Sequence, residues 1–507
     1  MPDVQTQAAT STGAEAVEAS RSVLDSIFDK VSLAPPDHTV AMSSFGGAVE
    51  SDSQSAMMAA ALKVFVDAVS DQRVDKLDKH LLDGLIGELD RKLSSQLDVI
   101  MHHEAFQKME SSWRGLKFLV DRTDFRRNVR VEILNVSKET LRESFEDAPE
   151  LIQSALYRHV YSGAYDQAGA DPYSAMVGNY EFDASAQDIS LLQSVSKVAA
   201  AAHCPFISSV GARFFKKKSM EDWKKIPDIS AYMDTADYVK WNAFRESEDS
   251  RYVGLTFPRF TLRVPYGPDT VPVKAFNYTE GVRGTDHEKY LWGNAAFAFA
   301  SNMSTAFAQD GWCVQIRGPQ SGGKVADLPV HLYDVGKGQE LKIPTEVPID
   351  ETLEFAASNL GLIPFSHYQG KDFAAFFSAN STQKPALYDD AAATANSRVN
   401  ARLPYIMLAS RLAHYLKVLQ RENIGTTKDA GRIQEELNRW IGGLITEMNN
   451  PPESVIARYP LRAGRVEVLE LPDNPGFYRV NMTFQPHFQV EGMDISLSLV
   501  GKMPKGK

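Results

Sequence analysis

Residues 318–324 carry the first pattern in the sequence that could do chemistry. They have the sequence GPQSGGK, which fits the GxxxxGK spacing of a phosphate-binding loop, where glycine amides and a lysine cradle a nucleotide. Such a loop needs Ser or Thr next, to hold Mg²⁺, and then a helix that points its N-terminus at the phosphates. Val325 occupies the hydroxyl position, and Leu328-Pro329 argues against a helix. We expect a glycine-rich surface loop here, with an NTPase using Gly318–Lys324 as an alternative.

The other clusters of titratable residues assign no acid, base and nucleophile. His102-His103-Glu104 resembles the start of a zinc-protease motif, but Gln107 occupies the position of the second histidine. Asp286-His287-Glu288 is a run of adjacent residues, whose side chains diverge on a regular element. Neither Cys204 nor Cys313 lies in a motif that marks a reactive or zinc-binding thiol. We therefore expect a protein that is not an enzyme and uses no metal or cofactor.

Size and charge narrow the class of protein further. The chain has 507 residues, 43% hydrophobic and 23% charged, as in a globular protein of two or three domains. Its net charge of −11 argues against a nucleic-acid binder, because phosphate binding draws on clustered Lys and Arg. The run Lys216-Lys217-Lys218 is short and isolated, and we interpret it as a solvated loop.

The sequence shows no pattern of an export signal or a membrane span. Residues Met1–Ala16 lack a basic segment followed by an apolar core. The most apolar stretch, Asn294–Phe307, is too short and too interrupted by polar residues to cross a bilayer. The two cysteines are far apart and suit a reducing compartment. We expect a cytoplasmic protein without direct membrane insertion.

The elements that position these residues alternate between helices and strands. Leucines recur every four residues from Leu77 to Leu97, which predicts a long helix with one apolar face. Alternating apolar residues from Asn128 to Leu134 predict a strand, and Ser137 is placed to cap a following helix. Further strands are predicted at Phe206–Val210, Tyr252–Phe257 and Cys313–Arg317. The alternation up to about residue 340 indicates an α/β region.

Composition divides the chain into three parts. Residues 1–55 are rich in Ala, Ser, Thr, Gly and Pro and are expected to form a flexible arm. Residues 56–375 hold the α/β region. Residues 376–507 begin with two predicted long helices, over 396–423 and 427–448. The fold class expected is therefore mixed α/β and α+β, with several domains.

The C-terminal end is predicted to be β. Strands at 465–471 and 477–484 flank the turn sequence at 472–476 and predict a hairpin. A terminal strand is predicted from three apolar residues that alternate with polar ones: Ile495, Leu497 and Leu499. A strand at a chain end can complete its own sheet or extend the sheet of a neighbour.

One segment of the N-terminal arm has helical spacing. Leu24, Ile27 and Phe28 lie on one face of a two-turn helix. An isolated helix of this length is not stable in water. The segment is therefore either a partner-binding motif or a piece that packs on its own domain, and composition does not decide between these.

Several long motifs, some containing Trp, resemble one known family. They are Ser112–Leu116 (SWRGL), Arg251–Gly267, Phe276-Asn277 with Glu280, Tyr290–Ala296, Ile316–Gly318 with Gly322-Gly323, Pro460–Arg462 and Pro486–Gln489. These stretches are similar to the TssC/VipB (ImpC/EvpB) family, the large subunit of the type VI secretion contractile sheath. The resemblance runs from about residue 55 to residue 503.

The resemblance implies a structural role in a contractile machine. Family members pair with a small sheath subunit, TssB/VipA, and stack with copies of themselves around a tube of Hcp rings, above a baseplate. Contraction drives the tube into a target cell, and a ClpV-type AAA+ ATPase disassembles the contracted sheath. A phage or pyocin-like tail sheath is the related alternative, which would use one sheath protein and no ATPase-binding arm.

The resemblance also implies roles for individual residues. The short helix near residue 453 would face the tube, with Glu453, Arg458 and Arg462 as its charged contacts. The arm residues Leu24, Ile27 and Phe28 would bind the ATPase. The terminal strand with Ile495, Leu497 and Leu499 would be exchanged between subunits. The chain departs from the family pattern at Tyr459 and Gly464.

Overall fold

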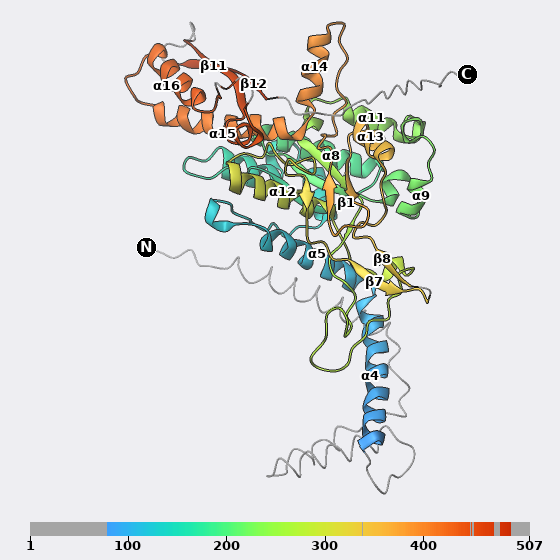
Figure 1. Ribbon diagram of the computed structural model, residues 1–507. Coiled ribbons are helices and arrows are strands. Elements are labelled where there is room, and N and C mark those ends of the chain that lie inside the picture. Colours follow the sequence, from blue (N-terminus) through green and yellow to red (C-terminus); the bar gives the residue numbers. More distant parts are fainter. Residues whose placement is uncertain (1–78, 337, 447, 449–450, 471–476, 488–507) are drawn as a thin grey trace, which may run out of the picture. The chain divides into compact units, whose positions relative to one another are not determined.

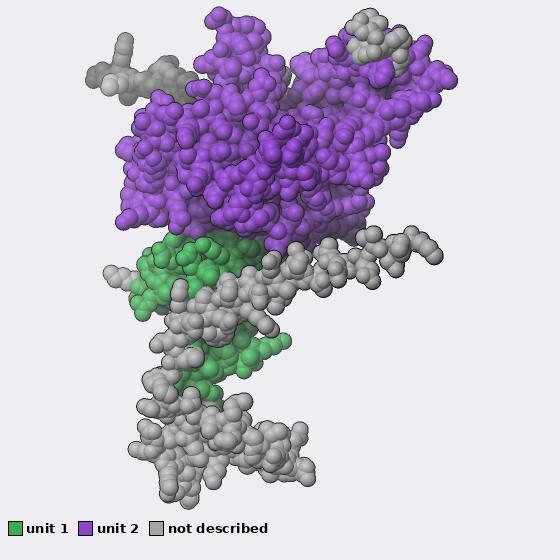
Figure 2. Space-filling view, turned by 180° about the vertical axis from the view of Figure 1, so that it is seen from behind, with its two compact units in different colours: residues 1–114, 261–293, 329–342 green, residues 115–260, 294–328, 343–507 purple. Residues whose placement is uncertain are grey.

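Figure 1 shows the computed structural model of the chain, in which helices and strands alternate along the sequence. The structure describes residues 79–336, 338–446, 448, 451–470 and 477–487. Contacts divide these residues into two compact units, which Figure 2 colours separately. Unit 1 holds residues 79–114, 261–293 and 329–342, and unit 2 holds the rest. Each unit is thus built from segments that are distant in sequence.

Unit 1 combines helices with a long irregular segment. Its helices and strands are α4 (Lys79–Met101), the first part of α5 (Glu104–Asp121), β5 (Trp292–Gly293), β7 (His331–Asp334) and β8 (Gln339–Lys342). The helix predicted from the leucine spacing is confirmed as α4. Polar side chains of α4 fasten the irregular segment: Asp98 accepts hydrogen bonds from the Tyr278 hydroxyl at 2.7 Å and the Gly281 amide at 2.9 Å. These bonds replace the ladder that the irregular segment lacks.

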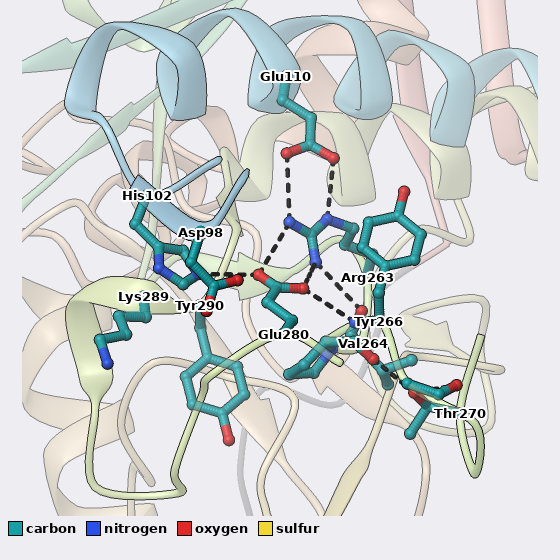
Figure 3. A network of polar contacts seen from close by, with 12 residues as sticks. Asp98, His102, Glu110, Arg263, Val264, Tyr266, Thr270, Glu280, Lys289 and Tyr290 are labelled. Carbon is teal, nitrogen blue, oxygen red and sulfur yellow. Dashed lines mark hydrogen bonds and ion pairs between the residues drawn. The ribbon is translucent and has the colours of Figure 1, made fainter. Parts of the chain in front are cut away.

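A buried cluster of charges joins the helices of unit 1 to this segment, as Figure 3 shows. The Arg263 guanidinium donates to Glu110 at 2.8 Å and to Glu280 at 2.6 Å. Glu280 also lies 2.9 Å from the His102 Nε2 and accepts the Tyr266 amide at 2.9 Å. Burial opposes ionisation of Glu280, but the bonds from His102 and Arg263 outweigh it and lower its pKa to about 2. The carboxylate is therefore held charged inside unit 1.

The core of unit 2 is a six-stranded sheet in the order β1-β2-β3-β9-β10-β6. Its strands are β1 (Met176–Phe182), β2 (Phe206–Val210), β3 (Val253–Phe257), β9 (Ile363–His367), β10 (Ala374–Phe376) and β6 (Lys324–Val325). β1, β2, β3 and β9 run parallel, and β10 and β6 continue the sheet antiparallel. Every residue of β2 and β3 is buried, as expected for parallel strands covered on both faces.

Helices with apolar and small residues pack on this sheet. α8 (Ala186–Ala202) and α12 (Ala295–Asp310) both contact β2 and β3. The other short elements of unit 2 are α6 (Lys138–Glu146), α7 (Ala155–Tyr157), a π-helix (Arg158–Tyr165), α9 (Met220–Lys224), α10 (Ile229–Met233), α11 (Val239–Arg245) and α13 (Glu351–Asn359), and β4 (Phe260–Thr261) begins at its last residue before unit 1. The core thus follows from uninterrupted apolar runs in both strands and helices.

The predicted strands had mixed outcomes. Those at 206–210 and 252–257 are confirmed as β2 and β3. The one at 313–317 is wrong: Val314 and Ile316 are buried at alternate positions, but the backbone turns back at a bridge from Arg317 to Gly322. The one at 128–134 is also wrong, because this extended segment joins no ladder among the described residues. Alternation reports which side chains are buried, whereas a strand also needs a pairing partner.

The C-terminal helices are α14 (Ala391–Asn400), α15 (Leu403–Asn423), α16 (Ala430–Gly442) and α17 (Glu453–Arg458). The single helix predicted over 396–423 is wrong, since it breaks between Asn400 and Leu403. Pro404 explains the break: proline lacks the N–H of a helix interior and fits only the first turn, where α15 places it. The amphipathic helix predicted over 427–448 is confirmed in part as the shorter α16.

The predicted C-terminal hairpin is confirmed. β11 (Leu461–Glu470) pairs antiparallel with β12 (Tyr478–Pro486), and Glu470 lies opposite Tyr478. Its apolar face packs on α16, where Ile433, Leu437 and Ile441 join Val466 and Val468 in one cluster. A hairpin of two strands is marginal alone, so this packing is what stabilises it.

Acid should weaken unit 1 through Glu280. Its pKa is about 2 when folded and about 4.3 in an unfolded chain, so its contribution is complete above that value and is lost as the pH falls towards 2. We expect Glu280→Gln to lower stability by about 3 kcal/mol at pH 7 and to flatten the pH dependence between pH 4.5 and 2. Thermal unfolding followed by circular dichroism measures both. Glu88→Gln is the control, because Glu88 is half-exposed and pairs with the exposed Lys92 on the same helix. Equal losses in both variants would contradict the account.

Candidate assembly surfaces

The three residues predicted to face the tube lie on one short stretch of unit 2. Glu453 begins α17, Arg458 ends it, and Arg462 is the second residue of β11. All three side chains are exposed. Between them, Ala457 and Leu461 are buried and fix the backbone of the stretch. The structure therefore presents this acidic and basic set to the outside on an anchored turn.

The glycine-rich loop supports the start of α17. The Gln315 side-chain amide donates to the Glu453 carbonyl at 3.1 Å, and the Ser321 hydroxyl lies 3.5 Å from the Glu453 carboxylate. α12 packs against α17 as well. Burial raises the pKa of Asp310, at the end of α12, and the charge of Arg458 partly offsets that rise. Sequence analysis missed this contact, since it joins segments more than a hundred residues apart.

The same loop has a geometry unlike that of a phosphate-binding loop. The Gly318 amide donates to the Phe376 carbonyl at 2.7 Å, and the Gly323 amide donates to Gly318 at 2.8 Å. Lys324 begins strand β6 and not a helix, and its ammonium lies 4.3 Å from the centre of the Phe373 ring. These two amides of the loop thus donate to carbonyls of the protein itself and not to a phosphate. This arrangement gives the NTPase alternative no support.

The two edges of the β11–β12 hairpin differ. The Asn438 side chain of α16 bonds both the N–H and the C=O of Val466, at 2.9 and 2.7 Å, and Gln434 accepts the Val468 amide at 3.0 Å. Side chains of α16 therefore occupy the outer edge of β11. In an antiparallel ladder, two residues that lie opposite each other either both direct their N–H and C=O groups toward the partner strand or both direct them away from it. Since Val466 points outward, so does Met482 opposite it.

The outer edge of β12 is consequently open as far as the described residues go. The outward-facing positions of β12 follow Met482 at intervals of two, at Val480 and Phe484. Their outward backbone groups bond no partner within the described ranges. An open edge of this length is a template for one more strand. The sequence predicted the hairpin but not which edge is free, because that depends on Asn438 and Gln434 reaching across from α16.

The remaining predicted site residues lie outside the described residues. These are Leu24, Ile27 and Phe28 of the arm and Ile495, Leu497 and Leu499 of the terminal strand. In the described part of the chain, no cluster of three or more His, Cys, Asp or Glu side chains is arranged to hold a metal ion. Nor does any helix described there have both the length and the apolar character needed to cross a bilayer.

The loop glycines should be sensitive to substitution. Gly322 has a φ of +83°, and an added Cβ would lie 2.1 Å from the Gln315 carbonyl oxygen. We expect Gly322→Ala to lower the free energy of unfolding by about 3 kcal/mol, from backbone strain and displacement of the loop. Gly336→Ala is the matched control, because its φ is +79° but no atom lies within 4 Å of the added Cβ. Its cost should be about 1 kcal/mol. Denaturant unfolding would contradict this if both variants lost the same amount.

Comparisons with known proteins agree with the resemblance in the motifs. The family described as EvpB/VC_A0108 matches twice: its tail sheath N-terminal domain covers residues 83–383, and its tail sheath gpW/gp25-like domain covers 392–503. The "Type VI secretion system sheath protein TssC1" of Pseudomonas aeruginosa is 40% identical over 430 residues, which span 84% of this chain and 86% of that protein.

Solved structures of injection systems resemble this chain more weakly, in both sequence identity and TM-score. The baseplate of the anti-feeding prophage matches with a TM-score of 0.38 and 10% identity, over 74% of this chain and 83% of that one. The contracted PVC sheath of an extracellular contractile injection system matches with a TM-score of 0.34 and 8% identity, over 61% and 68%. These scores are too low to carry an argument. The two domain matches and the 40% identity do carry one, and by them the chain belongs to the EvpB/VC_A0108 tail sheath family, the TssC/VipB family of its motifs.

Proposed function

We propose that the chain is the large structural subunit of a type VI secretion contractile sheath. It assembles with a small sheath subunit of the TssB/VipA kind, and with copies of itself, around an Hcp tube. Contraction of this sheath on its baseplate drives the tube into a target cell. The protein works in the cytoplasm and catalyses no reaction. The family assignment and the 40% identity to the type VI secretion sheath protein of Pseudomonas aeruginosa support this proposal.

The open edge of β12 is the structural observation that supports the proposal most strongly. A structural subunit of a lattice needs a connection that survives large movements of its neighbours. A strand paired through backbone hydrogen bonds supplies one, because its link to the parent subunit can swing while the ladder stays intact. The terminal strand with Ile495, Leu497 and Leu499 is the donor we assign to this edge in a neighbouring subunit. The blocked edge of β11 directs the donor to β12.

The tube-facing role is assigned to α17 and the start of β11. Exposed Glu453, Arg458 and Arg462 offer both signs of charge on a stretch that buried residues hold in place. Exposed charges of this kind fix register and orientation more than they add affinity. In the arm, Leu24, Ile27 and Phe28 are the residues we assign to a ClpV-type AAA+ ATPase. No contact among the described residues favours the alternative of a tail sheath made of one protein.

Truncation at the C-terminus tests the exchanged strand. We expect deletion of residues 494–507 to abolish long tubes while pairing with the small subunit persists, because only the lattice connection is lost. Deletion of residues 501–507, which keeps the strand, is the matched control and should leave tubes intact. The measurement is co-expression with the small subunit, followed by affinity co-purification and sedimentation. Sedimenting tubes of normal yield from the longer deletion would refute the strand assignment.

Charge reversal tests the tube surface. We expect Arg458→Glu combined with Arg462→Glu to weaken binding of the Hcp tube about tenfold, since two rim charges would turn from attraction to repulsion. Assembly with the small subunit should persist. Co-sedimentation of purified tube with preassembled sheath measures the effect, and Arg432→Glu on the exposed side of α16 is the control. Unchanged binding in the double variant would remove these residues from the tube surface.

A further inference from the structure

Helix α4 turns its polar face to the irregular segment of unit 1, while no described residue buries its apolar face. The Asn277 side-chain amide donates to Asp90 at 3.0 Å, and the Tyr278 hydroxyl donates to Asp98 at 2.7 Å. The face with these two aspartates is therefore the one that meets the rest of unit 1. An amphipathic helix on a protein surface normally docks the other way round, with its apolar face inward.

The apolar face of α4 is a stripe of five side chains at intervals of three or four residues: Ile86, Leu89, Leu93, Leu97 and Ile100. We call it the α4 stripe. None of the five is buried, and Ile86 and Leu93 are 40% and 39% exposed. With a turn of about 100° per residue, the stripe lies about 100° around the helix axis from the face that holds Asp90 and Asp98. Docking of the polar face thus leaves the stripe without cover from the described residues.

An uncovered stripe is costly for this helix in particular. α4 contains Gly84 and Gly87, each of which lowers helix stability by about 1 kcal/mol relative to alanine. Neither glycine has another part of the chain within 4 Å of the place where a Cβ would lie. Most of the stability of a helix in a protein comes from packing of its apolar face. α4 therefore needs a partner along the stripe.

The sequence just before α4 has a matching apolar pattern. Residues 57–69 lie outside the described residues and read MMAAALKVFVDAV, without glycine or proline. Four larger apolar residues recur at helical intervals: Met58, Leu62, Phe65 and Val69. The two charged residues, Lys63 and Asp67, fall on the opposite side of such a helix. The pattern predicts an amphipathic helix that also has an apolar face to cover.

We propose that residues 57–69 form a helix that packs antiparallel on the α4 stripe, as in a helical hairpin. The lengths agree, because residues 57–69 as a helix and the stripe from Ile86 to Ile100 each extend about 20 Å. The link also reaches. In this arrangement residues 70–78 have to span about 15 Å, along α4 and between the two helix axes, and nine residues can span about 30 Å.

The short link favours this occupant over a second copy of the chain or another protein. A tether of nine residues keeps the segment beside α4 at an effective concentration of the order of millimolar, which a separate chain does not reach. The hairpin also fixes where the N-terminal arm leaves unit 1. Residue 57 lies beside Ile100, at the end of α4 that Asp98 bonds to the irregular segment. A protein that pulls on the arm would then act first on this hairpin.

Hydrogen exchange measured by mass spectrometry tests the packing in the full chain at low concentration. Amides of residues 57–69 should exchange slowly. Ile86→Gln combined with Leu93→Gln should speed their exchange about tenfold, because apolar contact area is lost. Lys92→Gln combined with Ser95→Gln is the matched control, since both side chains are exposed on another side of α4 and glutamine suits a helix. Slow exchange of the amides of β2 shows that each variant has folded.

Three results would overturn the inference. Amides of residues 57–69 could exchange as fast as those of an unfolded chain, or they could be slow but unaffected by the variant of the stripe. Protection that appears only at high protein concentration would make a second copy the occupant. None of these results bears on the proposed function, which does not use this contact.

Cysteine pairs test the antiparallel direction. Met58→Cys with Leu97→Cys should form a disulfide when glutathione disulfide is the oxidant. Met58→Cys with Ile86→Cys should not, because Ile86 lies about 17 Å from Leu97 along the helix. Burial raises the pKa of the native thiols, Cys204 and Cys313, which keeps them unreactive. A disulfide in the second pair, or in neither pair, would overturn the antiparallel packing.

Discussion

Backbone hydrogen bonding is the constraint on which the rest of this structure depends. Every N–H and C=O group of an extended segment needs a partner, and the sheet of unit 2 provides partners for its inner strands. Among the described residues of unit 2, such groups lack a described partner at the outer edge of β12 and along residues 129–135. Soluble proteins that work alone cover or shorten such edges. Open edges beside a packed core are what a subunit needs if other chains complete its sheets.

The rest of the molecule keeps these edges in fixed positions. α16 packs on one face of the hairpin and also blocks the edge of β11, so one side is left for a partner. The turn of the glycine-rich loop binds the start of α17, and in unit 1 Arg263 joins two carboxylates that are buried with it. During contraction each subunit moves as a rigid body, so its contacts with neighbouring subunits change while its own core does not. Its energy then lies in differences between interfaces.

Local patterns predicted much of the fold. β2, β3, α4 and the C-terminal hairpin follow from apolar runs and turn chemistry that lie within a few residues. One failure has a local cause, since Pro404 ends the helix predicted over 396–423. The others concern partners distant in sequence. Residues 129–135 have the strand pattern but pair with no strand among the described residues, and the bond from Asn438 to Val466 exists only once α16 lies on β11. Arg263 and Glu280 were matched as family motifs, yet nothing in a motif says that they pair. For Glu453, Arg458 and Arg462, the sequence supplied the charges and the family resemblance supplied the role. Neither predicted the buried residues that hold their backbone in place.

A reconstruction by electron cryomicroscopy of tubes formed with the small subunit tests the central claim most directly. At a resolution that separates strands, the account predicts a sheet of more than two strands at β11–β12, extended on the side of β12. Tubes in which the hairpin stays two-stranded and its edge faces solvent would contradict the claim that open backbone edges hold this assembly together.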